Sequence, residues 1–289
     1  MRTMIDCHTH IIAAWHSEPL TEDKLLKAVD ALGIERFAIL PIGVSPETPY
    51  AYFGTEDVLE AYNRHPDRII PFCSLDPRNG YNSPNTDFSW ILIKYKELGC
   101  KGLGELTANL YFDDPRCENL FNHCGMVGLP VLFHLAERIG GTYGLVDDAG
   151  LPRLERCLRE CPNTIFIGHG PAFWSEISLD VDDATRGGYP KGQIIPGRLQ
   201  QLLREYPNLY GDLSADSGFN AITRDPDYGY KFLEEFQDKL LFGTDLCSVG
   251  QVVPIVGYFR QGLEEGKISK ATYDMITEQN AIRILCLEG

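Results

Sequence analysis

The sequence predicts an α/β fold, a (β/α)8 TIM barrel that residues 1–289 form as a single domain. Two observations lead to this prediction. Short apolar segments typical of strands alternate with segments of helical spacing along the whole chain, and alternation of this kind is typical of parallel βαβ units. The apolar segments number eight, enough to close a barrel, and barrels of roughly 250 residues commonly form one domain.

The eight predicted strands end at residues that are mostly polar. These strand ends are His8, Pro41, Asp76, Glu105, His134, His169, Asp212 and Asp245. Between them, residue types that favour helix starts precede three of the helical segments, at Thr21, Thr55 and Asp114-Pro115. Four later helices are predicted at residues 151–160, 197–206, 226–237 and 252–264.

Two long segments without regular spacing follow the fifth and sixth predicted strands, at residues 136–150 and 170–196. Loops of this length within compact domains are usually functional or disordered. In a barrel, the loops after the strands form the mouth of the active site. We therefore expect the segment 170–196 to form a lid or substrate wall, with the segment 136–150 beside it.

Composition narrows the class of partner. The formal net charge is −15 and no long run of Lys or Arg occurs, which argues against nucleic acid and favours a small-molecule substrate. The nine cysteines are odd in number and include no C-x-x-C pair, as expected for buried thiols in a reducing compartment. No segment approaches ~18 continuous apolar residues. We expect a cytoplasmic protein without a membrane partner; the sequence leaves open whether it forms a homo-oligomer.

Four histidines and one aspartate at predicted strand ends have the residue types of a metal site: His8, His10, His134, His169 and Asp245. Side chains alternate along a strand, so His8 and His10 point the same way, roughly 6.6 Å apart along the chain. A single such histidine is most simply a hydrogen-bonded core residue. All five together at one end of a barrel indicate a metal centre.

Nitrogen and carboxylate ligands without cysteine suit Zn²⁺ or a similar divalent ion. Such an ion lowers the pKa of bound water from ~15.7 towards ~7. Asp245 is then the natural general base, because it can accept the proton of the water and return it to a leaving group. Asp6 either orients the site or is a turn residue at the strand end. The other histidines, His16, His65 and His123, are expected at the surface or at helix ends.

These motifs together resemble the amidohydrolase superfamily, and in particular its amidohydrolase-related (amidohydrolase 2) branch of metal-dependent hydrolases. The resemblance covers essentially the whole chain and rests on D-C-H-T-H (6–10), I-G-H-G (167–170), F-G-T-D (242–245) and N-A-I-R-I-L (280–285). It implies that His8 and His10 bind the more buried metal ion. It also implies that His134 and His169 bind a second ion or, in a one-metal site, the substrate, and that Asp245 is both ligand and proton shuttle.

Glu105 ends the fourth predicted strand in G-L-G-E-L. In the superfamily, a carboxylate at this point can bridge two metal ions, and Glu105 is similar to the strand-four glutamate of TatD-like deoxyribonucleases. The alternative is that Glu105 orients other ligands or bonds a substrate. Lys101, four residues earlier, lies too far from the mouth. The resemblance therefore implies one or two divalent ions, with Glu105 as a candidate ligand.

The sequence favours a metal-dependent hydrolase of a small ester, lactone or amide. The alternative is a metal-dependent decarboxylase of an aromatic or unsaturated acid, in which His169 and Asp245 would transfer protons. A TatD-like nuclease and a metal-binding protein without catalysis are less well supported. Candidate substrate contacts in the predicted mouth loops are Arg138, Tyr143 and Trp174, with Arg186 and Arg224 as further arginines there. The substrate itself is not determined by these residues.

Overall fold

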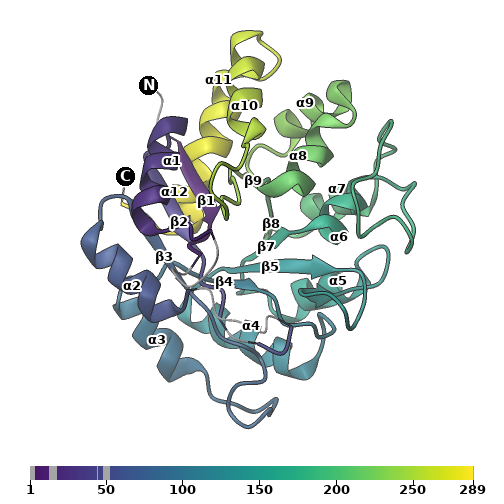
Figure 1. Cartoon of the computed structure of the whole chain (residues 1–289). Coiled ribbons are helices and arrows are strands. Elements are labelled where there is room, and N and C mark those ends of the chain that lie inside the picture. Colours follow the sequence, from purple (N-terminus) through teal and green to yellow (C-terminus); the bar gives the residue numbers. More distant parts are fainter. Residues whose placement is uncertain (1–3, 13–17, 44, 48–52, 289) are drawn as a thin grey trace.

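The structure, a computed structural model, describes residues 4–12, 18–43, 45–47 and 53–288. Parallel strands stand at the centre and helices surround them (Figure 1). The strands are β1 (Ile5–Thr9), β2 (Arg36–Ile39), β3 (Ile69–Cys73), β4 (Gly102–Leu106), β5 (Val131–Ala136), β6 (Leu145–Val146), β7 (Phe166–His169), β8 (Leu209–Asp212) and β9 (Leu240–Leu241).

The helices occupy the intervals between the strands and the end of the chain. They are α1 (Glu22–Leu32), α2 (Thr55–Arg64), α3 (Ser89–Glu97), α4 (Pro115–Val127), α5 (Pro152–Glu160), α6 (Pro171–Trp174), α7 (Arg198–Glu205), α8 (Ala215–Thr223), α9 (Pro226–Glu235), α10 (Pro254–Glu264), α11 (Lys270–Asp274) and α12 (Asn280–Ile284). A 3-10 turn, η1 (Ser175–Ile177), follows α6, and a π-helical turn, η2 (Met275–Gln279), joins α11 to α12.

The strands form one parallel sheet that closes on itself. Their order is β1-β2-β3-β4-β5-β7-β8-β9, and β6 pairs with β5 outside this path. Backbone hydrogen bonds join the two ends of the sheet: the amide of Cys7 donates to Phe242 at 2.9 Å, and the amide of Asp245 donates to His8 at 2.8 Å. The predicted (β/α)8 barrel is therefore confirmed.

The interior of the barrel is apolar over part of its length. Alternate residues of successive strands, such as Ile70, Leu132 and Ile167, pack into one buried cluster. The last helix adds Ile284 to this cluster, so the end of the chain closes the barrel at the amino-terminal ends of the strands. A larger apolar layer fills the space between the strands and the surrounding helices. Functional side chains are thereby left to the other end of the barrel.

Asp6 ties β1 to the segment after β9. Its carboxylate accepts hydrogen bonds from the amide of His8 at 3.0 Å, from the amide of Thr244 at 3.0 Å and from the hydroxyl of Thr244 at 2.6 Å. Burial raises the pKa of Asp6 to about 7, although the bonds from Thr244 and His8 oppose the shift. Asp6 thus fixes the backbone that presents His8.

Some elements differ from the prediction. β3 and β9 end at Cys73 and Leu241, ahead of Asp76 and Asp245, because the chain bends away once the lateral hydrogen bonds stop. The segment 89–97 is the helix α3, which is not predicted from the sequence. Its consecutive apolar residues W-I-L-I lack helical spacing. The segment 170–196 starts with α6 and η1 and is therefore less irregular than expected.

All nine cysteines are free thiols, and seven of them are buried, as the sequence indicates. Cys247 lies part-buried and Cys286 is exposed. Within the described part of the chain, no helix has both the length and the apolar character needed to cross a membrane.

Candidate metal centre

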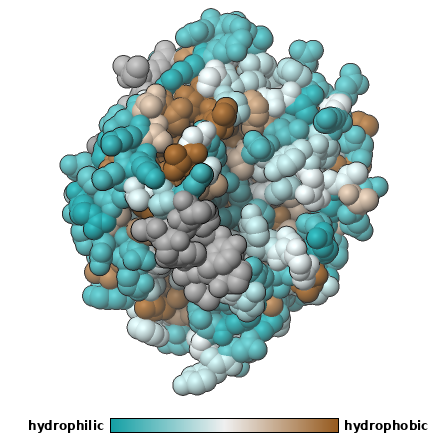
Figure 2. All heavy atoms as spheres, viewed as in Figure 1, coloured by the Kyte–Doolittle hydropathy of each residue, from teal (hydrophilic) through white to brown (hydrophobic). Residues whose placement is uncertain are grey.

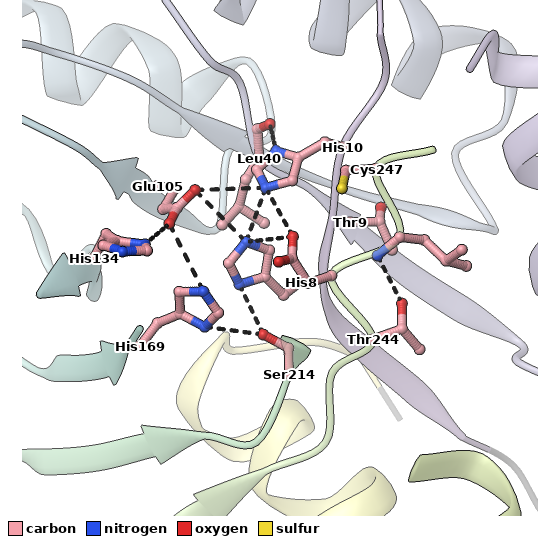
Figure 3. A network of polar contacts seen from close by, with 12 residues as sticks. His8, Thr9, His10, Leu40, Glu105, His134, His169, Ser214, Thr244 and Cys247 are labelled. Carbon is pink, nitrogen blue, oxygen red and sulfur yellow. Dashed lines mark hydrogen bonds and ion pairs between the residues drawn. The ribbon is translucent and has the colours of Figure 1, made fainter. Parts of the chain in front are cut away.

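Histidines and carboxylates converge where the strands end (Figure 3). His8 and His10 come from β1 and the residue after it, His134 from β5 and His169 from β7. Glu105, in β4, lies among their rings. All five residues are at least nine-tenths buried. The structure thus brings together the residues that the sequence selects at strand ends.

The rings of His8 and His10 present lone pairs to one point. The Nδ1 atom of His8 lies 2.7 Å from Asp212, and the Nδ1 atom of His10 lies 2.9 Å from the carbonyl of Leu40. Both partners accept hydrogen bonds, so each neutral ring carries its proton on Nδ1. The two Nε2 atoms are then acceptors, yet they face each other at 2.9 Å.

Carboxylate oxygens complete this cluster. Asp245 Oδ1 lies 3.4 Å from Nε2 of His10 and 3.6 Å from Nε2 of His8, and Glu105 Oε2 lies 3.5 Å from Nε2 of His10. A cation between acceptors gathered in this way would stabilise them. Ligands placed tetrahedrally around Zn²⁺ at ~2.0–2.1 Å lie roughly 3.3–3.5 Å apart. The three spacings that involve a carboxylate oxygen are close to this range, whereas the two Nε2 atoms, 2.9 Å apart, would have to separate slightly.

Two groups of potential ligands are present among the described residues, and they share His8. One consists of His8, His10 and Asp245, and the other of His8, Glu105 and His169. Within each, ligand atoms lie within 4.8 Å of one another. The carboxylate of Glu105 has one oxygen on each side: Oε2 towards His10, and Oε1 3.9 Å from Nε2 of His169. Glu105 therefore has the position of a bridging ligand.

His134 is placed differently from the other histidines. Its Nδ1 atom bonds Glu105 Oε1 at 2.8 Å, and it belongs to neither group of three. Its ring packs against Tyr143 with 4.5 Å between ring centroids. In this arrangement His134 orients Glu105 and faces the cavity.

Asp212 and Ser214 are central to the site, although the sequence marks Asp212 as a strand end and nothing more. Asp212 Oδ2 lies 2.7 Å from Nδ1 of His8 and 3.0 Å from Nδ1 of His169. The hydroxyl of Ser214 donates to Asp212 at 2.7 Å and lies 3.0 Å from Nδ1 of His169. Asp212 thus fixes the tautomer and orientation of two histidines. One sequence signal could have identified Asp212: it ends the predicted strand N-L-Y-G-D, just as Asp245 ends another predicted strand.

The buried charges shift one another's pKa. Burial alone would raise the pKa of Glu105 and Asp212, but the neighbouring histidines hold both far below their usual range. Burial alone would lower the pKa of His169, but Asp212 raises it to about 9. The pKa of Asp245 is also lowered, since His8 and His10 outweigh the effect of burial. The carboxylates are therefore ionised and ready to bind a cation.

Asp245 occupies a backbone conformation that few residues other than glycine adopt, with φ of 55°. Gln251 stabilises it: the side-chain amide donates to the carbonyl of Asp245 at 2.8 Å and accepts from the amide of Cys247 at 2.9 Å. This bend turns Asp245 from the end of the barrel wall into the cavity, where its side chain is 23% exposed. A strained residue held by its surroundings is typical of functional sites.

A cavity of about 670 Å³ opens above the cluster. Its walls come from the loops after the strands and include His10, Glu105, His134, His169, Asp245 and Tyr143. Tyr143 is thus where a substrate contact is expected. Arg138 is not among the lining residues; it pairs with the adjacent Glu137.

The structure places Trp174 in the core. Its side chain is 2% exposed, and its indole N–H donates to the carbonyl of Asp212 at 2.8 Å. Trp174 does not line the cavity. A bulky side chain in a long loop could not be distinguished from a wall residue by sequence, because the helical turn α6 that carries it inward is only four residues long.

Two of the mouth-loop arginines, Arg186 and Arg224, are also buried. Arg186 is fully buried and donates to the carbonyl of Asp147 at 2.7 Å, which joins the segment 170–196 to the segment 136–150. The side chain of Arg224 is 2% exposed and lies 3.5 Å from Asp180. Neither lines the cavity.

The remaining histidines are remote from the centre where they are described. His65 follows α2 and pairs with Glu22 at 3.0 Å, and His123 on α4 bonds the carbonyl of Asn119 at 2.8 Å. His16 lies outside the described residues. Lys101, at the opposite end of β4, reaches the carbonyl of Cys286, as its position in the sequence predicts.

The chain belongs to the amidohydrolase family, whose sequence model matches residues 5–287. It is therefore an enzyme of this superfamily, as the motifs predict. No curated protein is significantly similar to the chain in sequence.

Solved structures resemble it along the whole chain. A probable 2-pyrone-4,6-dicarboxylic acid hydrolase from Acinetobacter baumannii is 13% identical, with a TM-score of 0.60 and coverage of 98% of this chain and 99% of that one. An uncharacterised TIM-barrel protein from Bordetella bronchiseptica is 16% identical, with a TM-score of 0.67 and 99% of each chain covered. The 2,6-dihydroxybenzoate decarboxylase from Rhizobium is 16% identical, with a TM-score of 0.59 and 100% of each chain covered. At these identities the likeness establishes the shared fold.

Proposed function

We propose that this enzyme is a zinc-dependent hydrolase that cleaves a small-molecule ester, lactone or amide. The observation that supports it best is the position of Glu105, which belongs to one group of ligand atoms with His169 and turns its other oxygen towards His10 of the second group. Two ions about 3.5–4 Å apart, bridged by a carboxylate, are common in hydrolytic sites. When bound, such an ion polarises the scissile carbonyl and lowers the pKa of its bound water towards ~7.

The residues of the chain divide the remaining work. His8, His10 and Asp245 would hold the more buried ion, and Glu105 and His169 would hold the second or, with one ion, face the substrate. The Asp245 side chain is partly exposed in the cavity and ionised, so it can accept a proton from water and return it to the leaving group. Asp212 and Ser214 keep His8 and His169 in position. Tyr143 contacts the substrate from the cavity wall, and burial raises the pKa of its hydroxyl, which stays a donor.

We propose a cytoplasmic location from the state of the thiols. Seven buried free cysteines and one part-buried at the cavity are compatible with a reducing environment, which supports a cytoplasmic location.

Metal stoichiometry tests the binuclear centre. The purified chain is expected to bind about two zinc ions, and Glu105→Ala about one, because the bridging carboxylate is lost. Glu137→Ala is the matched control, since Glu137 lines the same cavity but belongs to neither ligand group. A single ion in the wild type, unchanged in Glu105→Ala, would contradict the two-ion site.

The reaction class is tested separately. The zinc-loaded enzyme is given esters, lactones, amides and aromatic carboxylic acids, and acid release and carbon dioxide release are measured together. Hydrolysis without carbon dioxide supports the proposal. Carbon dioxide release from an aromatic acid would instead assign the same His169 and Asp245 to proton transfer in a decarboxylase.

A further inference from the structure

The cavity lacks a cationic anchor. Among the residues that the structure describes, its walls include no lysine or arginine. They do include Glu18, Glu47 and Glu137, in addition to Glu105 and Asp245. Outside the described part of the chain, the only lysine or arginine in the sequence is that at position 2, ahead of β1. Positive charge at the cavity wall is therefore scarce in this chain.

The arginines near the mouth already have partners. Arg78 donates to both carboxylate oxygens of Glu47 at 2.8 Å each, and this pairing lowers the pKa of Glu47 to about 2 despite its partial burial. Arg138 pairs with the wall residue Glu137. A substrate carboxylate would have to displace the pair of Arg78 or of Arg138 to gain either guanidinium. Arg186 and Arg224 keep buried N–H groups that have no hydrogen-bond partner among the described residues, but neither residue lines the cavity.

The cavity continues past Asp245 into a second chamber of about 480 Å³. Tyr189, Ala215 and Cys247 belong to the walls of both chambers. The walls of the second chamber are polar and apolar in about equal measure, and the one charged wall residue besides Asp245, in the described chain, is Asp216. Figure 2 shows a hydrophobic patch on this face of the molecule. The patch lies over the loop that leads into α10, which is labelled in Figure 1. Among the described residues, the second chamber thus also lacks a lysine or arginine to pair with an anion.

The metal centre would supply little spare positive charge. With one divalent ion, Glu105 and Asp245 would balance its charge, and with two ions, Glu105, Asp245 and Asp212 would balance three of the four positive charges. The wall also carries Glu18, Glu47 and Glu137. In a cavity with low-dielectric walls, like charges repel more strongly than in water. The surroundings of a bound substrate would therefore carry little net positive charge.

We infer that the substrate is an ester, lactone or amide without a carboxylate, uncharged or cationic on both sides of the bond that is cleaved. The inference rests on the proposed hydrolysis, because the cleaved bond must reach the ion beside Asp245. The two chambers would then hold the two parts of the substrate. This class differs from the dicarboxylic and aromatic acids named for two of the similar structures.

A pair of zinc-binding ligands of equal length tests the inference independently of turnover. Hexanohydroxamic acid and adipic monohydroxamic acid differ in a terminal carboxylate, and their affinities for the zinc-loaded full-length chain are measured by calorimetry. The uncharged ligand is expected to bind at least about tenfold more tightly. Thr142→Lys places a cation on the exposed cavity wall and should shift this ratio about three- to tenfold towards the carboxylate ligand. Thr142→Gln, of similar length, should leave the ratio unchanged.

Equal or tighter binding of the adipic ligand by the wild type would overturn the inference. A zinc-loaded Thr142→Lys variant with an unchanged ratio would overturn it as well, since the cavity charge would then have no influence on the ligand. Failure of the wild type to bind zinc in a direct titration would instead remove the proposed function, and the two failures are thereby distinguished.

Discussion

The two ends of the barrel interior differ in character although the same strands build both. In β5, Leu132 packs into the apolar cluster and His134, two residues later, faces the cavity. In β7, Ile167 and His169 repeat this change. Two residues of a strand rise about 6.6 Å. This distance separates the apolar cluster, which stabilises the fold, from the side chains that face the cavity.

The difference has an energetic meaning. Full burial of an apolar side chain in the amino-terminal cluster stabilises the fold by roughly 1.5–3 kcal/mol. Buried carboxylates and imidazoles at the other end destabilise it unless they are paired or bind an ion. The apolar end therefore supports a polar end whose own residues are arranged for binding a cation.

The largest expected effect concerns the reactive end. Asp245→Asn should lower kcat by about 10²–10⁴-fold on any ester that the wild type hydrolyses, because the amide cannot accept the proton. Steady-state kinetics measure this, and circular dichroism checks that the fold persists. Turnover near that of the wild type would exclude Asp245 as the proton shuttle.

The apolar end should respond in stability alone. Leu132→Ala leaves a cavity in the fully buried cluster and should lower the free energy of unfolding by about 2–5 kcal/mol, measured in urea. Zinc affinity should stay within about twofold, because the chain beyond Leu132 keeps its hydrogen bonds. Met126→Ala, at a position 67% exposed, is the control and should cost under about 0.5 kcal/mol. A loss of zinc binding in folded Leu132→Ala would show that the two ends are coupled.

Asp212 belongs to the reactive end, where it ends β8 and holds two histidines. Asp212→Asn should weaken zinc binding about 10–100-fold, because His8 and His169 lose the acceptor that fixes their tautomers. Competition with a chelator gives the affinity. Asp216→Asn, an exposed position four residues later, is the matched control. Equal zinc affinities of the two variants would show that Asp212 does not position the histidines for zinc binding.

The smallest effect is expected at Ser214. Ser214→Ala removes one hydroxyl from the pair of histidines while Asp212 remains, so zinc affinity should fall only about two- to tenfold. The same chelator competition measures it. A fall as large as that in Asp212→Asn would mean that the hydroxyl, rather than the carboxylate, orients the rings.

The sequence was sufficient for the barrel and for much of the centre. Glu105, His134 and His169 lie at the ends of their strands, as does His8, while His10 follows β1 and Asp245 lies four residues after β9. Parallel strands bring such ends together. It was insufficient for the mouth. Trp174 and Arg186 lie in a long loop whose path depends on its packing, and both are buried where a position at the substrate was considered.

The sequence by itself determined which residues could bind a metal ion, because the period of a strand and the order of βαβ units fix the end at which they gather. The tertiary structure alone decided how they act together. It placed Asp212 behind two histidines, Glu105 between two groups of ligands, and acidic and apolar walls around the cavity. These relations join residues from separate strands and loops, and lateral distances of this kind leave no periodic signal along the chain.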